Sequence, residues 1–336
     1  MISRRRSEPM PVKYWSAAGL MLTYWCNARC ASCYLRCGPD RRERMDMGTA
    51  LDCWRQLQKT SPHGCRIHLT GGEPFGDYPM LLDLCRRAQA DGLGPLQKIE
   101  TNAFWATDEG ICRRRIGELA QAGMQKLSLS ADPYHQQFVP IRRVRTAAAV
   151  AREMLGPQRV QVRWEDWLTE GFDTHALSPA ERRGVFIRFG REGRDRLNGR
   201  AAERFPDENG GKCLSDLADG NCRESLLRSK HVHVDPDGMV VPGVCAGIIL
   251  GRLSDGIARV WRDLYCGWAD RPIVGRLAEA GPVGLLDEAV GKGFQPAERY
   301  DRKCRLCWEV RKFFLQRGEY LDELGPVWMY QAEEAQ

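Results

Sequence analysis

Over the first two hundred residues, short apolar runs alternate with longer amphipathic stretches. The apolar runs predict six β-strands, at residues 19–24, 66–70, 97–102, 125–130, 159–165 and 184–189. Apolar residues at helical spacing predict helices between them, at residues 49–59, 79–91, 108–122, 141–155 and 178–183. This alternation is typical of an α/β fold with a parallel sheet and right-handed crossovers. Six units are too few for an eight-stranded barrel, so we expect an open, partial (β/α)6 TIM-like barrel.

Four of the predicted strands end in two polar residues at alternate positions. The pairs are His68 with Thr70, Glu100 with Asn102, Ser128 with Ser130, and Arg163 with Glu165. Alternate residues of a strand share one face, and a strand covered on both faces would be apolar throughout. Ordinary hydrogen-bonded residues at strand ends would explain any single pair. Their repetition predicts a polar, functional interior at the carboxyl ends of the strands, where barrel active sites lie.

Beyond residue 199 the predicted elements are shorter, and glycine and proline are more frequent. Residues 231–234 and 239–241 flank Asp235-Pro236-Asp237-Gly238, which predicts a β-hairpin. His231 and His233 alternate in the first of these strands and could pair on a metal, although solvent-facing or hydrogen-bonded histidines are commoner. We expect a basic N-terminal arm (1–13), a core domain (14–198), a small α+β domain (199–320) and a C-terminal tail (321–336).

Three of the fourteen cysteines, Cys26, Cys30 and Cys33, directly follow the first predicted strand. Their spacing places three thiolates in one loop, and a three-thiolate site leaves one metal position open. A turn with two glycines and a carboxylate, Gly71-Gly72-Glu73-Pro74, follows the next strand and could receive the amine of a small ligand. The alternative is a closed zinc site completed by Cys37. Four isolated cysteines read as small core residues, namely Cys53, Cys65, Cys85 and Cys112.

This pair of motifs resembles the radical S-adenosylmethionine (radical SAM) enzymes, over roughly residues 14–200. In that family three cysteines hold a [4Fe–4S] cluster, whose fourth iron binds the amino and carboxylate groups of S-adenosylmethionine (SAM). Reductive cleavage of SAM gives a 5'-deoxyadenosyl radical, which abstracts hydrogen from the substrate. The resemblance implies that Cys26, Cys30 and Cys33 are the cluster ligands.

The resemblance also implies residues that contact SAM. Gly71, Gly72, Glu73 and Pro74 match the amine-binding turn, and Asn102 and Ser128 match positions used around the ribose and carboxylate. The family commonly has an aromatic residue before the third cysteine, where this chain has Ser32. We therefore expect Tyr34, just after that cysteine, to stack on the adenine.

A second group of cysteines lies in the C-terminal part, with Cys304-Arg305-Leu306-Cys307 at metal-ligand spacing. This part resembles the SPASM and twitch domains that hold auxiliary clusters in many radical SAM enzymes. The further closely spaced cysteines of a complete SPASM domain are missing, which favours one auxiliary [4Fe–4S] cluster. Its implied ligands are Cys222, Cys245, Cys304 and Cys307, with Cys213 in reserve for Cys222. Four thiolates would also suit zinc.

Composition narrows the function class only slightly. No apolar run approaches the roughly 18 residues of a membrane helix, and no apolar segment follows the basic start as in a secretory signal. We therefore expect a cytoplasmic protein. Arginine far outnumbers lysine and is concentrated between Arg182 and Arg204, where interleaved acidic residues allow a solvated face as well as an anionic partner. No nucleic-acid-binding motif accompanies this charge, and nucleic acid is not expected.

The expected function is radical chemistry on a peptide or protein side chain, as in an oxidoreductase-type maturase, with flavodoxin or ferredoxin as reductant. One alternative is a radical SAM enzyme of small-molecule cofactor biosynthesis. The alternative from another class is a non-catalytic zinc or iron–sulfur scaffold that binds a partner or RNA.

Overall fold

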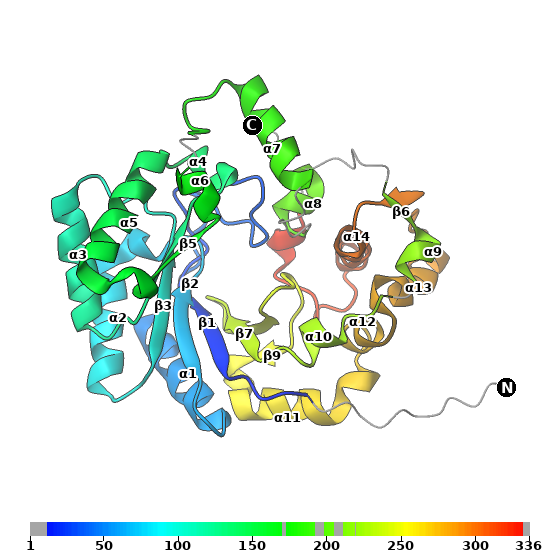
Figure 1. Ribbon diagram of the computed structural model, residues 1–336. Helices are drawn as coiled ribbons and strands as arrows, with labels where there is room; N and C mark the ends of the chain where they lie inside the picture. Colours follow the sequence, from blue (N-terminus) through cyan, green and yellow to red (C-terminus); the bar gives the residue numbers. More distant parts are fainter. Residues whose placement is uncertain (1–11, 170–172, 192–197, 205–210, 219, 332–336) are drawn as a thin grey trace.

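The computed structural model describes residues 12–169, 173–191, 198–204, 211–218 and 220–331. Within them, the main sheet has eight strands in the order β5-β4-β3-β2-β1-β7-β8-β9 (Figure 1). The parallel strands are β1 (Ala17–Met21), β2 (Arg66–Thr70), β3 (Leu96–Thr101), β4 (Leu127–Ser130), β5 (Val160–Arg163) and β7 (His231–Val234). Strands β8 (Met239–Pro242) and β9 (Gly251–Arg252) extend the sheet antiparallel. The predicted α/β class with a parallel sheet is confirmed.

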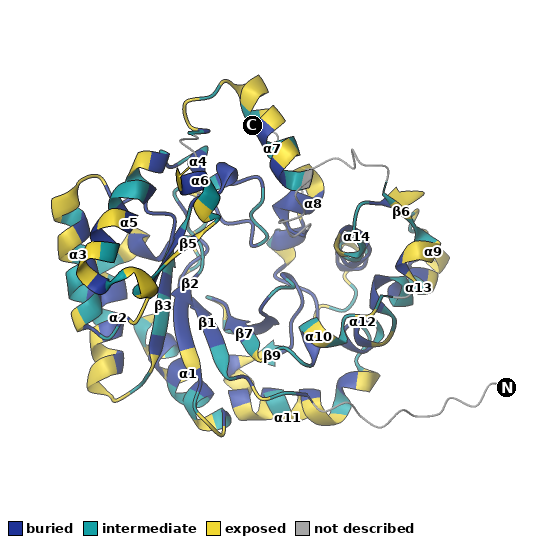
Figure 2. Ribbon diagram, in the orientation of Figure 1, coloured by how far each residue is buried: buried dark blue, intermediate teal, exposed yellow. Residues whose placement is uncertain are grey.

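The connecting helices are amphipathic and pack with their apolar side on the sheet. They are α1 (Met47–Thr60), α2 (Tyr78–Ala90), α3 (Glu109–Gln121) and α5 (Ile141–Leu155). In α1 the buried residues include Ala50, Trp54 and Leu57, which recur at helical spacing on one face. Asp46 caps the same helix by accepting a hydrogen bond from the Thr49 amide. Figure 2 shows exposed residues on the outer surfaces of these helices and buried residues along the strands.

The predicted sixth strand, residues 184–189, is wrong. These residues belong to helix α7 (Pro179–Arg191). The apolar run fits a helix because Val185 and Phe189, four residues apart, are both buried. Phe189 packs edge-on against Trp164 and Trp167 from the end of β5 and the helix that follows it. A short apolar run does not by itself distinguish a strand from a buried helix.

The sixth parallel strand is instead supplied by the C-terminal part of the chain. The predicted hairpin is present as β7 and β8, and β7 pairs in parallel with β1 through Ala17–Leu20 and His231–Val234. The main sheet therefore continues across the expected domain boundary at residue 199. The expected tail also packs against the rest of the chain as far as residue 330, because Tyr330 is buried and Trp328 packs edge-on against Tyr24.

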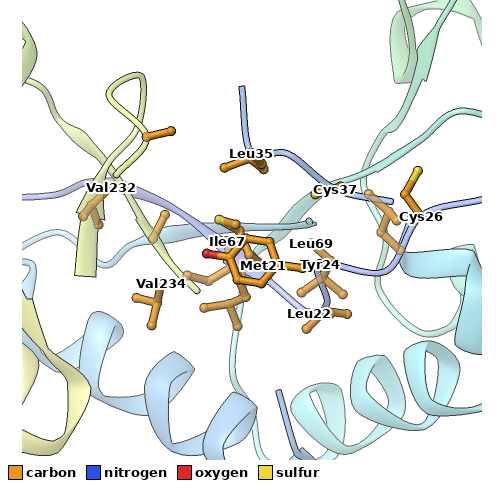
Figure 3. Close-up of a cluster of buried hydrophobic side chains, with 14 of the residues drawn as sticks. Met21, Leu22, Tyr24, Cys26, Leu35, Cys37, Ile67, Leu69, Val232 and Val234 are labelled. Atoms are coloured by element: carbon orange, nitrogen blue, oxygen red, sulfur yellow. The ribbon is translucent and has the colours of Figure 1, made fainter. Parts of the chain in front are cut away.

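The two faces of the sheet differ in character. Ile67 and Leu69 alternate with His68 and Thr70 along β2, and Val232 and Val234 alternate with the histidines of β7. Figure 3 shows these four apolar side chains within the buried cluster beside the central strands. The opposite face carries the polar residues, so it is the face on which a functional site is expected.

The remaining elements lie mostly in the C-terminal part, where α12, α13 and α14 group beyond β7 (Figure 1). Short helices of the N-terminal part are α4 (Pro133–Gln136) and α6 (Glu165–Thr169), with 3-10 turns η1 (Pro74–Asp77) and η2 (Pro157–Arg159). The later elements are α8 (Arg200–Arg204), β6 (Lys212–Cys213), α9 (Leu214–Leu217), α10 (Arg223–Leu226), η3 (Leu253–Asp255), α11 (Ile257–Gly267), η4 (Trp268–Asp270), α12 (Val274–Ala280), η5 (Gly281–Leu285), α13 (Leu286–Gly291), β10 (Arg299–Tyr300), α14 (Lys303–Gln316) and η6 (Val327–Tyr330). None of the helices in the described part of the chain combines the length and apolar character needed to cross a lipid bilayer.

Candidate active site

A cavity of about 530 Å³ opens on the polar face of the sheet. Two of the four predicted pairs of polar residues line it completely, His68 with Thr70 and Glu100 with Asn102. Of the third pair, Ser130 lines the cavity. Of the fourth pair, Arg163 lines the cavity, whereas Glu165 begins α6 and forms an ion pair with Arg152. The repeated polar positions therefore do converge on one site.

The cysteine loop forms one wall of this cavity. Cys26, Cys30, Cys33 and Tyr34 all line it. The loop is closed by backbone hydrogen bonds, from the Cys26 amide to Gly38 and from the Cys33 amide to the Cys30 carbonyl. All fourteen cysteines are free thiols. The three thiols of the predicted cluster site are thus gathered around one cavity, as a shared ligand set requires.

Arg200 anchors the cysteine loop from helix α8. Its guanidinium is buried and donates to the carbonyl oxygens of Cys30 and Cys37, both at 2.9 Å. Its backbone amide donates to the carbonyl of Cys33 at 3.1 Å. On the same helix, Glu203 forms an ion pair of 2.7 Å with the buried Arg36. The sequence suggested a solvated face for this arginine-rich stretch, and at Arg200 that alternative is wrong.

The environment of the thiols favours one of them as a thiolate. The Cys37 thiol donates a hydrogen bond to Cys33, and together with Arg200 it lowers the pKa of Cys33 despite burial. Burial raises the pKa values of Cys26 and Cys30, an effect that the nearby Arg200 partly offsets. Cys37 also lines the cavity, so a fourth thiol lies beside the three. The cysteines alone therefore fit either a three-thiolate cluster site or a closed zinc site.

The glycine turn is built against the segment that leads into the cysteine loop. A Cβ at Gly72 would lie 2.0 Å from the Trp25 carbonyl oxygen, and one at Gly71 would lie 2.5 Å from the Thr23 carbonyl oxygen. Gly71 also has a positive φ of 131°. Only glycine allows this close approach, and both glycines line the cavity. The turn and the cysteine loop are therefore held together.

Glu73 ties the same turn to β3. Its carboxylate accepts hydrogen bonds from the Thr101 hydroxyl at 2.8 Å, the Asn102 amide at 2.7 Å and the Phe75 amide at 3.1 Å. The side chain is fully buried, and burial raises its pKa to about 7. Neither Glu73 nor Pro74 lines the cavity, so the arrangement gives Glu73 a positioning role. Its direct contact with a ligand stays a prediction.

Two further predicted residues differ in how they meet the cavity. Asn102 lines it and donates from Nδ2 to the Asn27 side chain at 2.9 Å and to the Cys26 sulfur at 3.6 Å. Ser128 is buried and does not line the cavity, and its hydroxyl has no hydrogen-bond partner among the described residues. The next serine on that face, Ser130, lines the cavity instead.

An acid–histidine pair from the loop after β4 also reaches the cavity. Asp132 caps α4 by accepting hydrogen bonds from the amides of Tyr134 and His135, and its second oxygen lies 2.6 Å from His135 Nδ1. Burial opposes ionisation of both groups, yet their attraction lowers the pKa of Asp132 and raises that of His135. The geometry allows Asp132 both to cap the turn and, with His135, to face a ligand in the cavity.

The second group of cysteines comes together in the C-terminal part of the chain, and none of its members lines this cavity. Burial raises the pKa values of Cys222 and Cys245 to about 12, and the neighbouring thiols of Cys307 and Cys304 contribute to both increases. Cys304 and Cys307 lie in the first turn of α14. Cys213 lies elsewhere, at the start of α9, with its sulfur 2.8 Å from the Ser215 hydroxyl. The geometry thus favours Cys222 over Cys213, while metal binding here stays a prediction.

Comparison with known proteins gives structural similarity only. No family model and no curated protein matches this chain. A structure of BtrN in complex with AdoMet and 2-DOIA has 18% identity and a TM-score of 0.48, covering 87% of this chain and 99% of that one. A structure of Streptococcus suis SuiB bound to S-adenosylmethionine has 13% identity and a TM-score of 0.38, covering 87% and 77%. A structure of anSMEcpe with AdoMet and the Cp18Cys peptide has 14% identity and a TM-score of 0.34, covering 91% and 98%.

Proposed function

We propose that this protein is a radical SAM enzyme whose active site is the cavity beside the cysteine loop. The observation that carries the proposal is the meeting of Cys26, Cys30 and Cys33 with Gly71 and Gly72 around one cavity. Thiolates are soft donors that suit iron–sulfur clusters. The buried Arg200 offsets part of their charge. The closed zinc alternative explains the cysteines but gives no role to the glycine turn.

In this proposal Cys26, Cys30 and Cys33 hold a [4Fe–4S] cluster, and the Gly71-Gly72 turn approaches the amine of SAM. Bound together, the cluster and SAM supply a 5'-deoxyadenosyl radical that abstracts hydrogen from the substrate. The chain's own residues position and enclose this chemistry. Asn102 orients the cysteine loop through Asn27, Glu73 fixes the turn, and Tyr34 is available to stack on the adenine.

Four cysteines form the proposed auxiliary site, Cys222, Cys245, Cys304 and Cys307. Their mutual proximity supports a single [4Fe–4S] cluster with four thiolate ligands. The buried Arg311 lies beside them and donates to the Cys307 carbonyl at 3.2 Å and the Ala246 carbonyl at 2.8 Å. A buried cation at this place offsets the charge of the thiolates.

We propose a peptide or protein side chain as the substrate. Pockets for drug-sized ligands span about 300–1,000 Å³, and a sulfonium nucleotide would take up much of the roughly 530 Å³ here. Little volume remains inside, which suits one side chain entering while the rest of the substrate stays outside. Arg163, in the cavity wall, would favour an acidic group near the reacting carbon. A compact small molecule is the second candidate, because it too would fit in the small volume that remains beside SAM.

The decisive experiment is anaerobic reconstitution with iron and sulfide, followed by reduction in the presence of SAM. We expect about eight irons per chain for two clusters and formation of 5'-deoxyadenosine. Replacing Cys26, Cys30 and Cys33 by Ala should abolish 5'-deoxyadenosine, whereas Cys266→Ala, at an exposed position, should not. Colourless protein that holds zinc and forms no 5'-deoxyadenosine would support the non-catalytic scaffold instead.

The substrate class can be tested on the same material. Peptides with acidic residues, matched neutral peptides and small carboxylic acids would each be added to the reduced enzyme with SAM. Faster formation of 5'-deoxyadenosine with a peptide, together with a mass change in that peptide, is the expected outcome. Stimulation by small acids alone would favour the second candidate.

A further inference from the structure

Three histidines meet in the wall of the cavity, on the two strands that flank β1. His68 comes from β2, and His231 and His233 come from β7. All three line the cavity. One ring nitrogen from each lies within 4.8 Å of the other two. Their ring centroids are 4.6 to 5.4 Å apart.

The pairing of the strands explains why these residues meet. Strand β1 lies between β2 and β7, and Gly19 is the register partner of both His68 and His233. A Cβ at Gly19 would lie 2.5 Å from His68 Nε2 and 2.6 Å from His233 Nε2. Glycine therefore leaves open the space into which both nitrogens point.

A second glycine accommodates the third ring. A Cβ at Gly243, beyond the end of β8, would lie 2.2 Å from His231 Nδ1. The three rings thus occupy space that side chains at Gly19 and Gly243 would fill. His68 and His233 are almost fully buried, and His231 is partly buried.

The chemistry of this cluster suits a cation, because each neutral imidazole offers a nitrogen lone pair. Imidazole nitrogen suits zinc, iron, nickel and copper. Three histidines with one open position form a known type of site for Zn²⁺. The Glu100 carboxylate, which accepts a hydrogen bond from the Thr70 hydroxyl at 2.8 Å and pairs with Lys98 at 2.6 Å, interacts electrostatically with His68 and places a negative charge on that side of the cluster.

We propose that His68, His231 and His233 bind one divalent first-row transition-metal ion. Its open coordination position faces the cavity, where a carboxylate, carbonyl or hydroxyl of a substrate could bind. The donors are nitrogen atoms, which separates this ion from any metal held by the cysteines. The inference goes beyond the proposed function and holds whether or not the cysteine loop carries a cluster.

The test uses the full chain, anaerobically reconstituted so that iron fills the cysteine sites, and then dialysed against Zn²⁺. We expect about one zinc per chain with nitrogen or oxygen ligands at about 2.0–2.1 Å by zinc X-ray absorption. The double variant His68→Gln/His233→Gln should bind zinc at least about tenfold more weakly. His63→Gln changes an exposed histidine and should bind zinc as the wild type does.

Iron content, circular dichroism and SAM cleavage are measured on the same samples. These readouts separate loss of the histidine site from loss of the iron–sulfur sites or of the fold. If the double variant does not fold, the zinc content and ligand shell of the wild type decide. Absence of zinc from iron-replete wild type, a shell of sulfur alone at about 2.3 Å in that sample, or unchanged binding in a folded double variant would overturn the proposal.

Discussion

At the scale of single residues, one arginine determines the shape of the cysteine loop. Arg200 spans the carbonyl groups of Cys30 and Cys37 with two nitrogens of its planar guanidinium. A lysine has one compact donor group and cannot reproduce such a bidentate contact. The loop is therefore held by a residue outside it, about 170 positions along the chain.

We predict that Arg200→Lys lowers the free energy of unfolding by on the order of 2 kcal/mol, because one buried carbonyl loses its partner. The same variant should hold less iron after reconstitution. Chemical denaturation of the metal-free protein and iron analysis measure the two effects. Arg262→Gln, at an exposed position on α11, is the matched control and should change neither. Full iron content and stability in Arg200→Lys would contradict the anchoring role.

Arg200 also shows which site residues can be predicted from the sequence and which cannot. Cys26, Cys30, Cys33, Gly71 and Gly72 were identifiable because their spacing is local and their chemistry is distinctive. Arg200 was not, since it lies among other arginines and acidic residues whose pattern is that of a solvated surface. For Ser128 and Ser130, strand alternation predicts that both lie on the same face of the sheet. It does not predict which of them reaches the cavity.

At the scale of elements, the β7–β8 hairpin connects the sheet with the cysteine segment. Asp235, in its turn, accepts a hydrogen bond from the Tyr24 hydroxyl at 2.8 Å, and its other oxygen accepts from the amides of Asp237 and Met239. Burial raises the pKa of Asp235 to about 6, above its usual value of 3.8. Ionised Asp235 is therefore less favourable in the folded protein than in the unfolded chain.

The sign of the resulting pH dependence follows from this raised pKa. The contribution of Asp235 to stability is complete below pH 4 and is lost as the pH rises through about 6. We predict that Asp235→Asn, which stays neutral, gains on the order of 3 kcal/mol relative to the wild type between pH 4 and pH 8. Urea denaturation at both pH values measures the difference. Asp270→Asn, at an exposed site, should show no such change, and equal behaviour of the two variants would refute the prediction.

Elements also differ in how far the sequence defined them. The bounds of the first five strands and of four long helices were predicted within a few residues, because the hydrophobic period and the turn residues indicated the same boundaries. The prediction of a strand at residues 184–189 rests on five apolar or small residues, with Arg188 among them, that fit both the strand and the helix period. The packing of Phe189 against two tryptophans decides for a helix. The pairing of β7 with β1 joins residues more than two hundred positions apart, which no local pattern encodes.

At the scale of the whole molecule, two groups of cysteines lie in different parts of one chain. If both hold clusters, the auxiliary group should be separable from SAM cleavage. We predict that replacing Cys304 and Cys307 together by Ala removes about half the iron while 5'-deoxyadenosine formation remains measurable. Iron analysis and chromatography of the reduced reaction provide the readouts. Unchanged iron would show that the C-terminal group holds no cluster, and Cys266→Ala controls for loss of an ordinary thiol.

The central place of β1 has a practical consequence for dissecting this protein. With residues beyond 198 removed, β1 would become a bare margin of the sheet, with unsatisfied amides and carbonyls along Ala17–Leu20. Such margins recruit strands from other molecules and lead to aggregation. The excised fragment would also lack Arg200. The first 198 residues, although they carry both N-terminal motifs, are thus ill suited to study in isolation.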